Sequence, residues 1–287
     1  MEIKIEQLHP LFCAKGRAID MRHDKSAEKI SALKSMLDKY AVYAAPHEVP
    51  LTNEEHISFS ALLGPIARKS APKISGTGIR LPFNEIVDQS NLDDENKIFK
   101  NGDKRLAYKR ANRQWHTDMS YRTNRATWSL LSAHIVPPNG GETEVVDMRA
   151  VYDDLPEKMK LRLEGLVAEH CYWHSRVLGG GPEPTPEERK TRPPAQHPLV
   201  HVHPRSGRKV LYIASHVRGI LGMPQEEAMG LINELLKIAT QPKYVFAYKW
   251  SVGDVLIWDN LATIHRGTDF DDQRYVRDMR RVTCREH

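Results

Sequence analysis

The chain of 287 residues has few cysteines and no long apolar run. Only Cys13, Cys171 and Cys284 occur, and an odd, widely spaced set argues against a disulfide framework and favours a reducing compartment. No stretch approaches the roughly 18 consecutive apolar residues of a membrane span. The first residues also lack the basic and apolar regions of a signal peptide. We therefore expect a cytoplasmic protein without a membrane partner.

The net charge is +5 at pH 7, which ordinary surface lysine and arginine side chains explain. One dense basic cluster stands near the C-terminus and comprises Arg274, Arg277, Arg280, Arg281 and Arg285. It lacks the interleaved aromatic residues on which single-stranded nucleic acid stacks. We therefore expect no nucleic-acid partner, and a pocket for a small anionic molecule is the other interpretation of the cluster.

The chain shows no internal repeat and no low-complexity tract, and its length suits a single domain. Short β-like runs separated by turn signals recur in its second half, at 128–136, 199–203, 209–214, 244–250, 254–258 and 279–284. Helical patterns are expected at 26–39, 52–64, 156–168 and 224–239, and a proline-rich excursion at 179–198. Many short strands with helices outside them predict a mostly β fold with flanking helices, of the jelly-roll or barrel type.

A weakly patterned segment covers about residues 66–112 and is rich in lysine, aspartate, asparagine and glycine. A short strand at 83–87 is the element that its sequence suggests. Long irregular segments inside a compact domain often cover a binding site. We therefore predict one domain over residues 1–287 with a lid-like insertion here.

The stretch WHTDMS, residues 115–120, places His116 and Asp118 two residues apart. On a strand these side chains share one face, although two polar residues in such an arrangement are more often structural. His265, at the far end of the run 254–267, supplies a third candidate ligand. Two imidazoles and one carboxylate on one side of an ion form the facial triad of non-haem Fe(II) oxygenases. The opposite positions stay open for a co-substrate and O₂.

A dicarboxylate co-substrate also needs a fixed cation near the metal, and arginine meets a carboxylate with two parallel hydrogen bonds. Arg277 follows His265 by one turn and one returning strand, so it is a candidate for this cation. Thr143, in the sequence GGETEV, can add a hydroxyl to the same carboxylate.

These motifs together resemble the taurine dioxygenase family of Fe(II)/2-oxoglutarate-dependent dioxygenases, and more narrowly its 2,4-dichlorophenoxyacetate dioxygenase branch. The matching stretches, which span nearly the whole chain, are LHPLF (8–12), WHTD (115–118), VPPNGGETEVVDMRAVYDDLP (136–156), HPLVHVHPRSGRKVLYI (197–213), WDN with HRG (258–267) and RDMRR (277–281). The resemblance implies a double-stranded β-helix with iron at its mouth, and a homo-oligomer, dimer or tetramer.

The resemblance also implies a role for each motif residue. His116, Asp118 and His265 match the iron ligands, which are also the catalytic residues. Thr143 and Arg277 match the residues that hold 2-oxoglutarate. Positions that match substrate contacts are Arg281, for the substrate anion, Asn112 and Lys73. O₂ is the remaining co-substrate.

The implied reaction hydroxylates a small anionic substrate. The favoured substrate is a phenoxyalkanoate such as 2,4-dichlorophenoxyacetate, which would yield a phenol and glyoxylate, together with succinate and CO₂. Taurine or an alkyl sulfonate or sulfate is the alternative within the same chemistry. A zinc hydrolase or isomerase, and a barrel that only senses a small acid, are the alternatives outside it.

Two departures from the family pattern leave questions open. Many relatives have an arginine directly after WDN, whereas this chain has Leu261, so a polar support of the site is missing or replaced. The segment between His265 and the arginine cluster is also one residue longer than in the 2,4-dichlorophenoxyacetate dioxygenase branch. Arg274 and Arg280 therefore compete with Arg277, and the four-residue gap between Arg277 and Arg281 favours Arg277.

Overall fold

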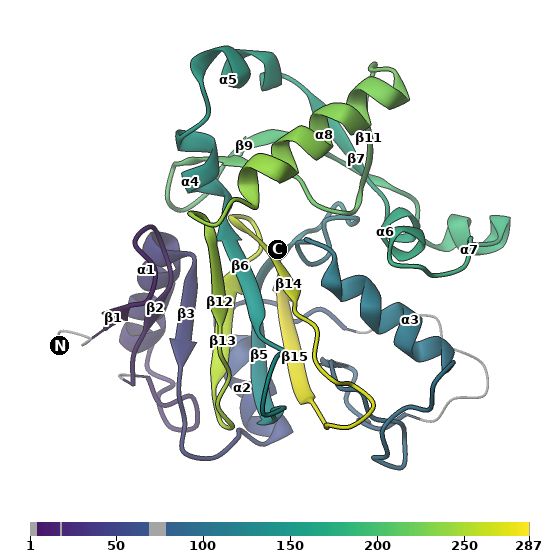
Figure 1. The fold of residues 1–287 in the computed structure, drawn as a ribbon. Helices are drawn as coiled ribbons and strands as arrows, with labels where there is room; N and C mark the ends of the chain where they lie inside the picture. The colour runs from purple at the N-terminus through teal and green to yellow at the C-terminus, as the bar shows by residue number, and fades with distance from the viewer. Residues whose placement is uncertain (1–4, 18, 69–78, 287) are drawn as a thin grey trace.

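The computed structural model of the chain describes residues 5–17, 19–68 and 79–286 (Figure 1). The strands in its first half are β1 Glu6–Gln7, β2 Ala14–Lys15, β3 Val42–Ala45, β4 Ile86–Asp88, β5 Ala126–Ile135, β6 Thr143–Asp147 and β7 Val167–His170. Those in its second half are β8 Ala195–Pro198, β9 Val200–Val202, β10 Lys209–Leu211, β11 Val217–Ile220, β12 Val245–Tyr248, β13 Val255–Asp259, β14 Thr263–Gly267 and β15 Asp278–Arg285.

The helices flank these strands. They are α1 Ala27–Tyr40, α2 Asn53–Leu63, α3 Lys104–Arg110, α4 Met148–Asp153, α5 Glu157–Leu163, α6 Tyr172–Leu178, α7 Pro186–Thr191 and α8 Gln225–Ala239, and a short 3₁₀ helix covers Ala111–Arg113. Within the described residues, these helices are too short or too polar to cross a membrane.

A seven-stranded sheet, in the order β1-β2-β3-β13-β5-β15-β4, faces a three-stranded sheet in the order β12-β6-β14. Strand β13 shows how its sequence serves both faces. Val255 and Ile257 pack on the side of helices α1 and α2, whereas Leu256 and Trp258 pack between the two sheets. This alternation is the period of two that a strand imposes. The two facing sheets with helices outside form the expected mostly β sandwich.

Helices α1 and α2 begin where their sequences predict. The side chain of Ser26 accepts a hydrogen bond from the backbone N–H of Lys29, and Thr52 and Glu55 form a reciprocal capping box. Helix α1 then buries Leu33 and Leu37 against the large sheet. The sequence predictions for these two helices are confirmed.

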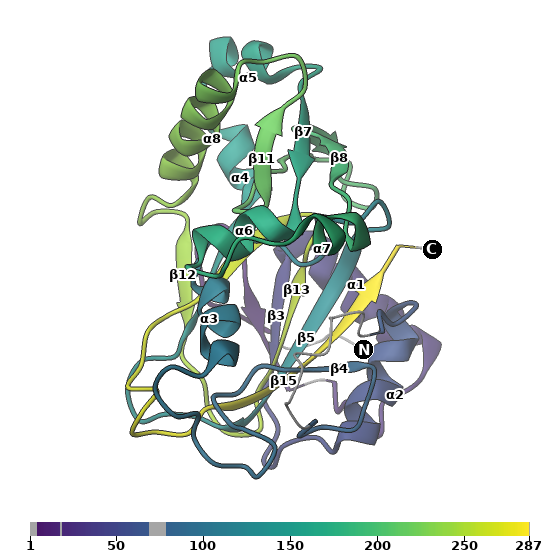
Figure 2. The same cartoon turned by 90° about the vertical axis from the view of Figure 1, so that its right-hand side faces the viewer.

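The other end of the molecule is built from α4, α5, α8 and the sheet β11-β7-β8, which lie above the large sheet in Figure 2. Ile264 of β14 points into the apolar core there, together with Leu231 and Leu235 of α8. Because side chains alternate along a strand, the next residue, His265, points the other way, toward Trp258. This places His265 at the mouth of the sandwich.

Three sequence expectations differ from the structure. The helix predicted for 156–168 ends at Leu163, and Val167–His170 forms strand β7 instead. The excursion at 179–198 contains a capped helix, α7, and strand β8. Strand β4 begins at Ile86, three residues later than the predicted start at 83. Strand β7 pairs with β8 and β11, and β8 pairs with β7 in turn, and local propensity does not report such contacts.

The described parts of the segment 66–112 contain strand β4 and helix α3, and α3 lies below α6 in Figure 2. Lys73 lies outside the described residues. That the chain forms one domain with a lid-like insertion here stays a prediction.

Candidate functional site

His116 and His265 are joined through their backbones. The N–H of His116 donates to the carbonyl of His265 over 2.9 Å, and the N–H of His265 donates back over 2.7 Å. This antiparallel bridge lies at the end of the segment that follows the 3₁₀ helix Ala111–Arg113. It holds the two imidazole rings with their centroids 4.2 Å apart. The predicted pairing of two distant stretches therefore rests on two backbone hydrogen bonds.

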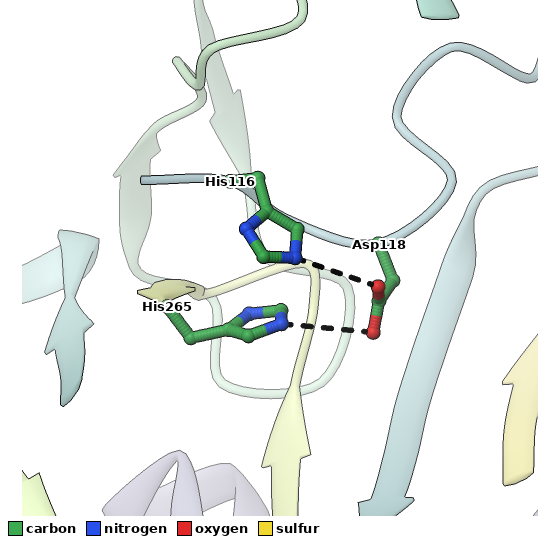
Figure 3. Close-up of side chains that lie close together, drawn as sticks. All are labelled: His116, Asp118 and His265. Carbon is green, nitrogen blue, oxygen red and sulfur yellow. Dashed lines mark ion pairs between the residues drawn. The ribbon is translucent and has the colours of Figure 1, made fainter. Parts of the chain in front are cut away.

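Asp118 completes the trio, but not from the strand that the sequence suggests. The chain leaves the bridge after His116 and enters a turn in which Met119 has a φ of 56°. That turn directs the carboxylate back toward both rings, as Figure 3 shows. The Nε2 atom of His116 lies 4.0 Å from Oδ1 of Asp118, and that of His265 lies 3.8 Å from Oδ2. All three residues are buried.

Asn260 holds the Asp118 loop in place. Its Oδ1 accepts hydrogen bonds from the backbone N–H of Asp118 over 3.1 Å and from Nε1 of Trp258 over 3.0 Å. Its Nδ2 donates to the hydroxyl of Ser129, which in turn donates to Oδ2 of Asp118 over 2.7 Å. The carboxylate therefore has a fixed orientation before any ligand binds. The sequence alone did not indicate a role for Asn260 or Ser129, although Asn260 belongs to the WDN motif.

The electrostatics of the trio favour the protonation states that bind a metal, namely neutral imidazoles and an ionised carboxylate. Burial lowers the pKa of His116, and it lowers that of His265 well below 6.5. For Asp118, burial opposes ionisation, but the positive charge of Arg281, aided by the hydrogen bond from Ser129, outweighs it and lowers the pKa. The carbonyl of Gln114 accepts a hydrogen bond from Nδ1 of His116 over 2.8 Å, which leaves Nε2 free to bind a metal.

The donor atoms of His116, Asp118 and His265 all lie within 4.8 Å of one another. Two neutral imidazoles and one ionised carboxylate are the donor set of a facial Fe(II) site. Neutral imidazole and ionised carboxylate are also the forms that metal binding requires. The residues present therefore fit an iron ion.

A second acidic trio with similar spacing consists of Asp38, His203 and Asp259. Arg205 spans it, because its Nε donates to Asp38 over 2.6 Å and its Nη2 contacts Oδ2 of Asp259. A guanidinium ion thus takes the place that a metal would need, and this trio has a structural role.

Arg277 and Thr143 border the cavity beside the two imidazoles, where both His116 and His265 also lie. Nε of Arg277 donates to the carbonyl of Gly141 over 3.1 Å. Gly141 has a φ of 74°, and a Cβ there would lie 3.2 Å from that same Nε atom. A glycine is required at this position of the GGETEV motif on both counts. Burial lowers the pKa of Arg277 to about 10, so the guanidinium stays charged at neutral pH.

The structure separates the arginines that the sequence left in competition. Arg274 is exposed, and Arg280 turns outward to Asn53 and Asp278. Arg281 lines the same cavity as Arg277 and donates through Nη1 to Oδ1 of Asp118. The geometry therefore brings Arg277 and Arg281 to the site, and not the other two.

A larger cavity of about 310 Å³ opens on the other side of Arg281 and also borders Asn112. Its wall includes the aromatic residues Tyr121 and Tyr172. Among the described residues, its lining is rich in cationic side chains, namely Arg68, Lys109, Arg122, Arg176, Arg192 and Arg281, against the single carboxylate of Asp88. Asn112 donates from Nδ2 to Oε1 of Gln89 over 2.9 Å. We refer to this space as the outer cavity and to the one beside the imidazoles as the inner cavity.

Leu261, which departs from the family pattern, is buried. Its N–H donates to Asp259, and its carbonyl accepts from Nε2 of His201 over 2.9 Å. The polar support of the site comes instead from the neighbouring Asn260. Trp258 packs against the ring of His265 with centroids 4.5 Å apart.

The sequence profile of the family "Taurine catabolism dioxygenase TauD, TfdA family" matches residues 4–283. The chain belongs to this family. It is 37% identical to the alpha-ketoglutarate-dependent 2,4-dichlorophenoxyacetate dioxygenase of Burkholderia sp. (strain RASC), over 99% of this chain and 94% of that protein. It is 32% identical to the (S)-phenoxypropionate/alpha-ketoglutarate-dioxygenase of Sphingobium herbicidovorans, over 81% of this chain and 78% of that protein.

The crystal structure of AAD-2 in complex with Mn(II) and N-oxalylglycine matches the chain with a TM-score of 0.92. The two are 36% identical in sequence, and the match covers 100% of this chain and 99% of that one. The jelly-roll prediction is thereby confirmed. Dioxygenases of this kind use Fe(II), 2-oxoglutarate and O₂, so the predicted cofactors and the oxidoreductase class are confirmed as well. The zinc hydrolase and the small-acid sensor no longer apply.

The hydrogen bonds of Asn260 lead to a prediction about metal affinity. Asn260→Ala removes the acceptor for the Asp118 backbone and the donor to Ser129, so the carboxylate loses its fixed orientation. We expect Mn(II), a stand-in for air-sensitive Fe(II), to bind about 10- to 100-fold more weakly. Isothermal titration calorimetry measures this affinity.

The matched control for that measurement is Asn233→Ala, because Asn233 is exposed on α8. Wild-type affinity in a folded Asn260→Ala variant would show that the loop needs no such support.

Proposed function

We propose that this protein hydroxylates a phenoxyalkanoate such as 2,4-dichlorophenoxyacetate, with 2-oxoglutarate and O₂ as co-substrates. Hydroxylation of the carbon beside the ether oxygen gives a hemiacetal, which breaks down to a phenol and glyoxylate, while 2-oxoglutarate becomes succinate and CO₂. The observation that carries the proposal is the position of the His116, Asp118 and His265 trio. Its two imidazoles line the inner cavity together with Arg277, and Arg281 borders both this cavity and the cationic outer cavity with its two tyrosines.

In this proposal, His116, Asp118 and His265 hold the Fe(II) ion. Bound iron would supply the activation of O₂ that oxidises a substrate C–H bond. The chain's own part is to fix three ligands on one side and to leave the other side open to the inner cavity, which shares Arg281 with the outer cavity. Ser129 and Asn260 keep the carboxylate oriented, and the buried position of the two imidazoles keeps them neutral.

Arg277 and Thr143 hold the distal carboxylate of 2-oxoglutarate in the inner cavity. The guanidinium is anchored through Nε on Gly141 and through Nη1 on the carbonyl of Gln89, and its other N–H groups remain for a ligand. The hydroxyl of Thr143 accepts a hydrogen bond from Nε1 of Trp250 over 3.2 Å, so its own hydrogen can point to the same carboxylate. A charged group in a buried cavity binds its counter-charge more strongly than one in water does.

The outer cavity is suited to an aromatic acid. Arg281 stands between it and Asp118, and the five N–H donors of a guanidinium allow contact with both Asp118 and a substrate anion. Tyr121 and Tyr172, whose ring centroids lie 5.0 Å apart, offer an aromatic wall to an aryl ring. Taurine has no ring to place there, so this wall supports the aryl acid over a sulfonate. Asn112 borders the same cavity as a second polar contact.

The resemblance also supports a proposal about where the protein acts and about its oligomeric state. We propose that the protein acts in the cytoplasm as a homo-oligomer, a dimer or a tetramer. Cys13, Cys171 and Cys284 are all free and buried, as they would be in a reducing compartment. Lys73 remains a predicted substrate contact.

The assignment of Arg277 predicts a selective effect on 2-oxoglutarate. Arg277→Gln removes the buried charge that the distal carboxylate needs, a loss of about 2 kcal/mol or more. We expect the KM for 2-oxoglutarate to rise about 30-fold or more. Arg274→Gln, a change of the same kind on an exposed side chain three residues earlier, should leave that KM unchanged. A rise with Arg274→Gln in place of Arg277→Gln would contradict the assignment.

The substrate class is tested by succinate release in air with Fe(II) and ascorbate. Aryloxyacetates, taurine, other alkyl sulfonates and alkyl sulfates form the panel. We expect aryloxyacetates to give the highest rate, with one phenol formed for each succinate, and His116→Ala to give neither product. Succinate release that taurine or an alkyl sulfate stimulates more than any aryloxyacetate does would overturn the aryl assignment.

A further inference from the structure

Gln89 and Asn112 occupy the junction of the spaces around the site. Both residues border the inner cavity and the outer cavity, and both also border a third cavity that runs from Arg277 to helix α3. Arg277 and Arg281 each border only two of these three spaces. The two amide side chains thus lie where the volumes for 2-oxoglutarate and for the prime substrate meet.

The two amides form one hydrogen-bonded pair. Nδ2 of Asn112 donates to Oε1 of Gln89 over 2.9 Å. An amide side chain has two N–H donors and one oxygen acceptor. The bond uses Nδ2 of Asn112 and Oε1 of Gln89. Within the described residues, the two remaining amide atoms, Nε2 of Gln89 and Oδ1 of Asn112, form no hydrogen bond, and neither is fully buried. The pair therefore presents one donor group and one acceptor to the cavities.

The backbone of Gln89 is hydrogen-bonded to strand β15, which carries Arg281, and to Arg277 just before it. Its N–H donates to the carbonyl of Met279 over 2.9 Å, and its own carbonyl accepts from Nη1 of Arg277 over 3.4 Å. One residue therefore touches the proposed 2-oxoglutarate anchor through its main chain and Asn112 through its side chain. Replacing the side chain alone separates these two contacts.

Asn112 itself sits on a well-placed element. It is the middle residue of the 3₁₀ helix Ala111–Arg113, which leads directly to the backbone bridge at His116. Gly179 packs closely on Ala111, because a Cβ on that glycine would lie 2.6 Å from the Ala111 Cβ. With the backbone held in this way, the amide of Asn112 still has freedom of rotation about its last side-chain bond. The hydrogen bond that Asn112 donates to Gln89 removes that freedom.

We propose that Gln89 is a positioning residue for the prime substrate, acting through Asn112, and that it sets the fraction of 2-oxoglutarate turnovers that end in substrate hydroxylation. The inference rests on the proposed function. An oriented Asn112 holds the substrate so that one C–H bond faces the open side of the His116, Asp118 and His265 trio. Without Gln89, the substrate occupies the outer cavity in several orientations, and part of the 2-oxoglutarate is consumed without product.

Gln89→Met tests this directly, because methionine keeps the length of the side chain and leaves the backbone carbonyl on Arg277. With an aryloxyacetate as substrate, we expect the ratio of phenol to succinate to fall about 3- to 10-fold, which is the effect of one neutral hydrogen bond. The KM for the aryloxyacetate should rise by a similar factor, and the KM for 2-oxoglutarate should stay within about twofold. A purely structural role would instead change both KM values and the melting temperature together.

The double variant Gln89→Met/Asn112→Ala decides whether Gln89 acts through Asn112. We expect its ratio of phenol to succinate to equal that of Asn112→Ala alone. In that single variant the hydrogen-bond partner of Gln89 is already absent, so removing Gln89 as well has no further effect. Gln241→Met, on an exposed glutamine just after α8, is the control and should behave as wild type.

Three results would overturn the inference while leaving the proposed function intact. They are wild-type coupling in Gln89→Met, an equal rise in the KM for 2-oxoglutarate, and additive losses in the double variant. A wild-type protein that forms no phenol from any aryloxyacetate would overturn the proposed function and this inference with it.

Discussion

The backbone bridge between His116 and His265 is the interaction on which the site depends. Its two hydrogen bonds join the segment after the 3₁₀ helix Ala111–Arg113 to strand β14. The turn that follows brings Asp118 to both rings, and Asn260 fixes that turn through the Asp118 N–H. Two imidazoles and a carboxylate then share one side of a small volume and leave the other side open. The open side faces the inner cavity, and the outer cavity adjoins it at Gln89, Asn112 and Arg281, so a co-substrate and a substrate can both approach the trio.

The two faces of strand β15 have different roles, because its side chains alternate between them. Arg281 and Met279 face the inside of the sandwich, where Arg281 meets Asp118. Asp278 and Arg280 face outward, and Asp278 pairs with Arg80 over 2.7 Å. Arg277, one residue before the strand, enters the inner cavity. A single strand thus provides cations to the site on one face and anchors the segment before α3 on the other.

The sequence alone predicted the three candidate ligands and Arg277 from motifs and their order, Arg281 from the family resemblance, and the helices at 26–39 and 52–64 from their local patterns. It missed Asn260, Ser129 and Gln89 because their roles depend on partners distant in the chain. It placed His116 and Asp118 on a strand. In the structure, a backbone bridge at His116 and a turn with Met119 at positive φ bring the two side chains together instead. It also missed strand β7, whose pairing with β8 and β11 outweighs a helical pattern. Long-range contacts of this kind leave no local signal.

The central claim is that the metal trio and Arg277 form one binding site for 2-oxoglutarate, and thermodynamic coupling tests it most directly. Calorimetric titration of 2-oxoglutarate under nitrogen, with and without Mn(II), measures how much the metal tightens binding. The account predicts a tightening of about 10-fold or more, which disappears in Asp118→Ala. Equal affinity of the wild-type protein for 2-oxoglutarate with and without metal would contradict it.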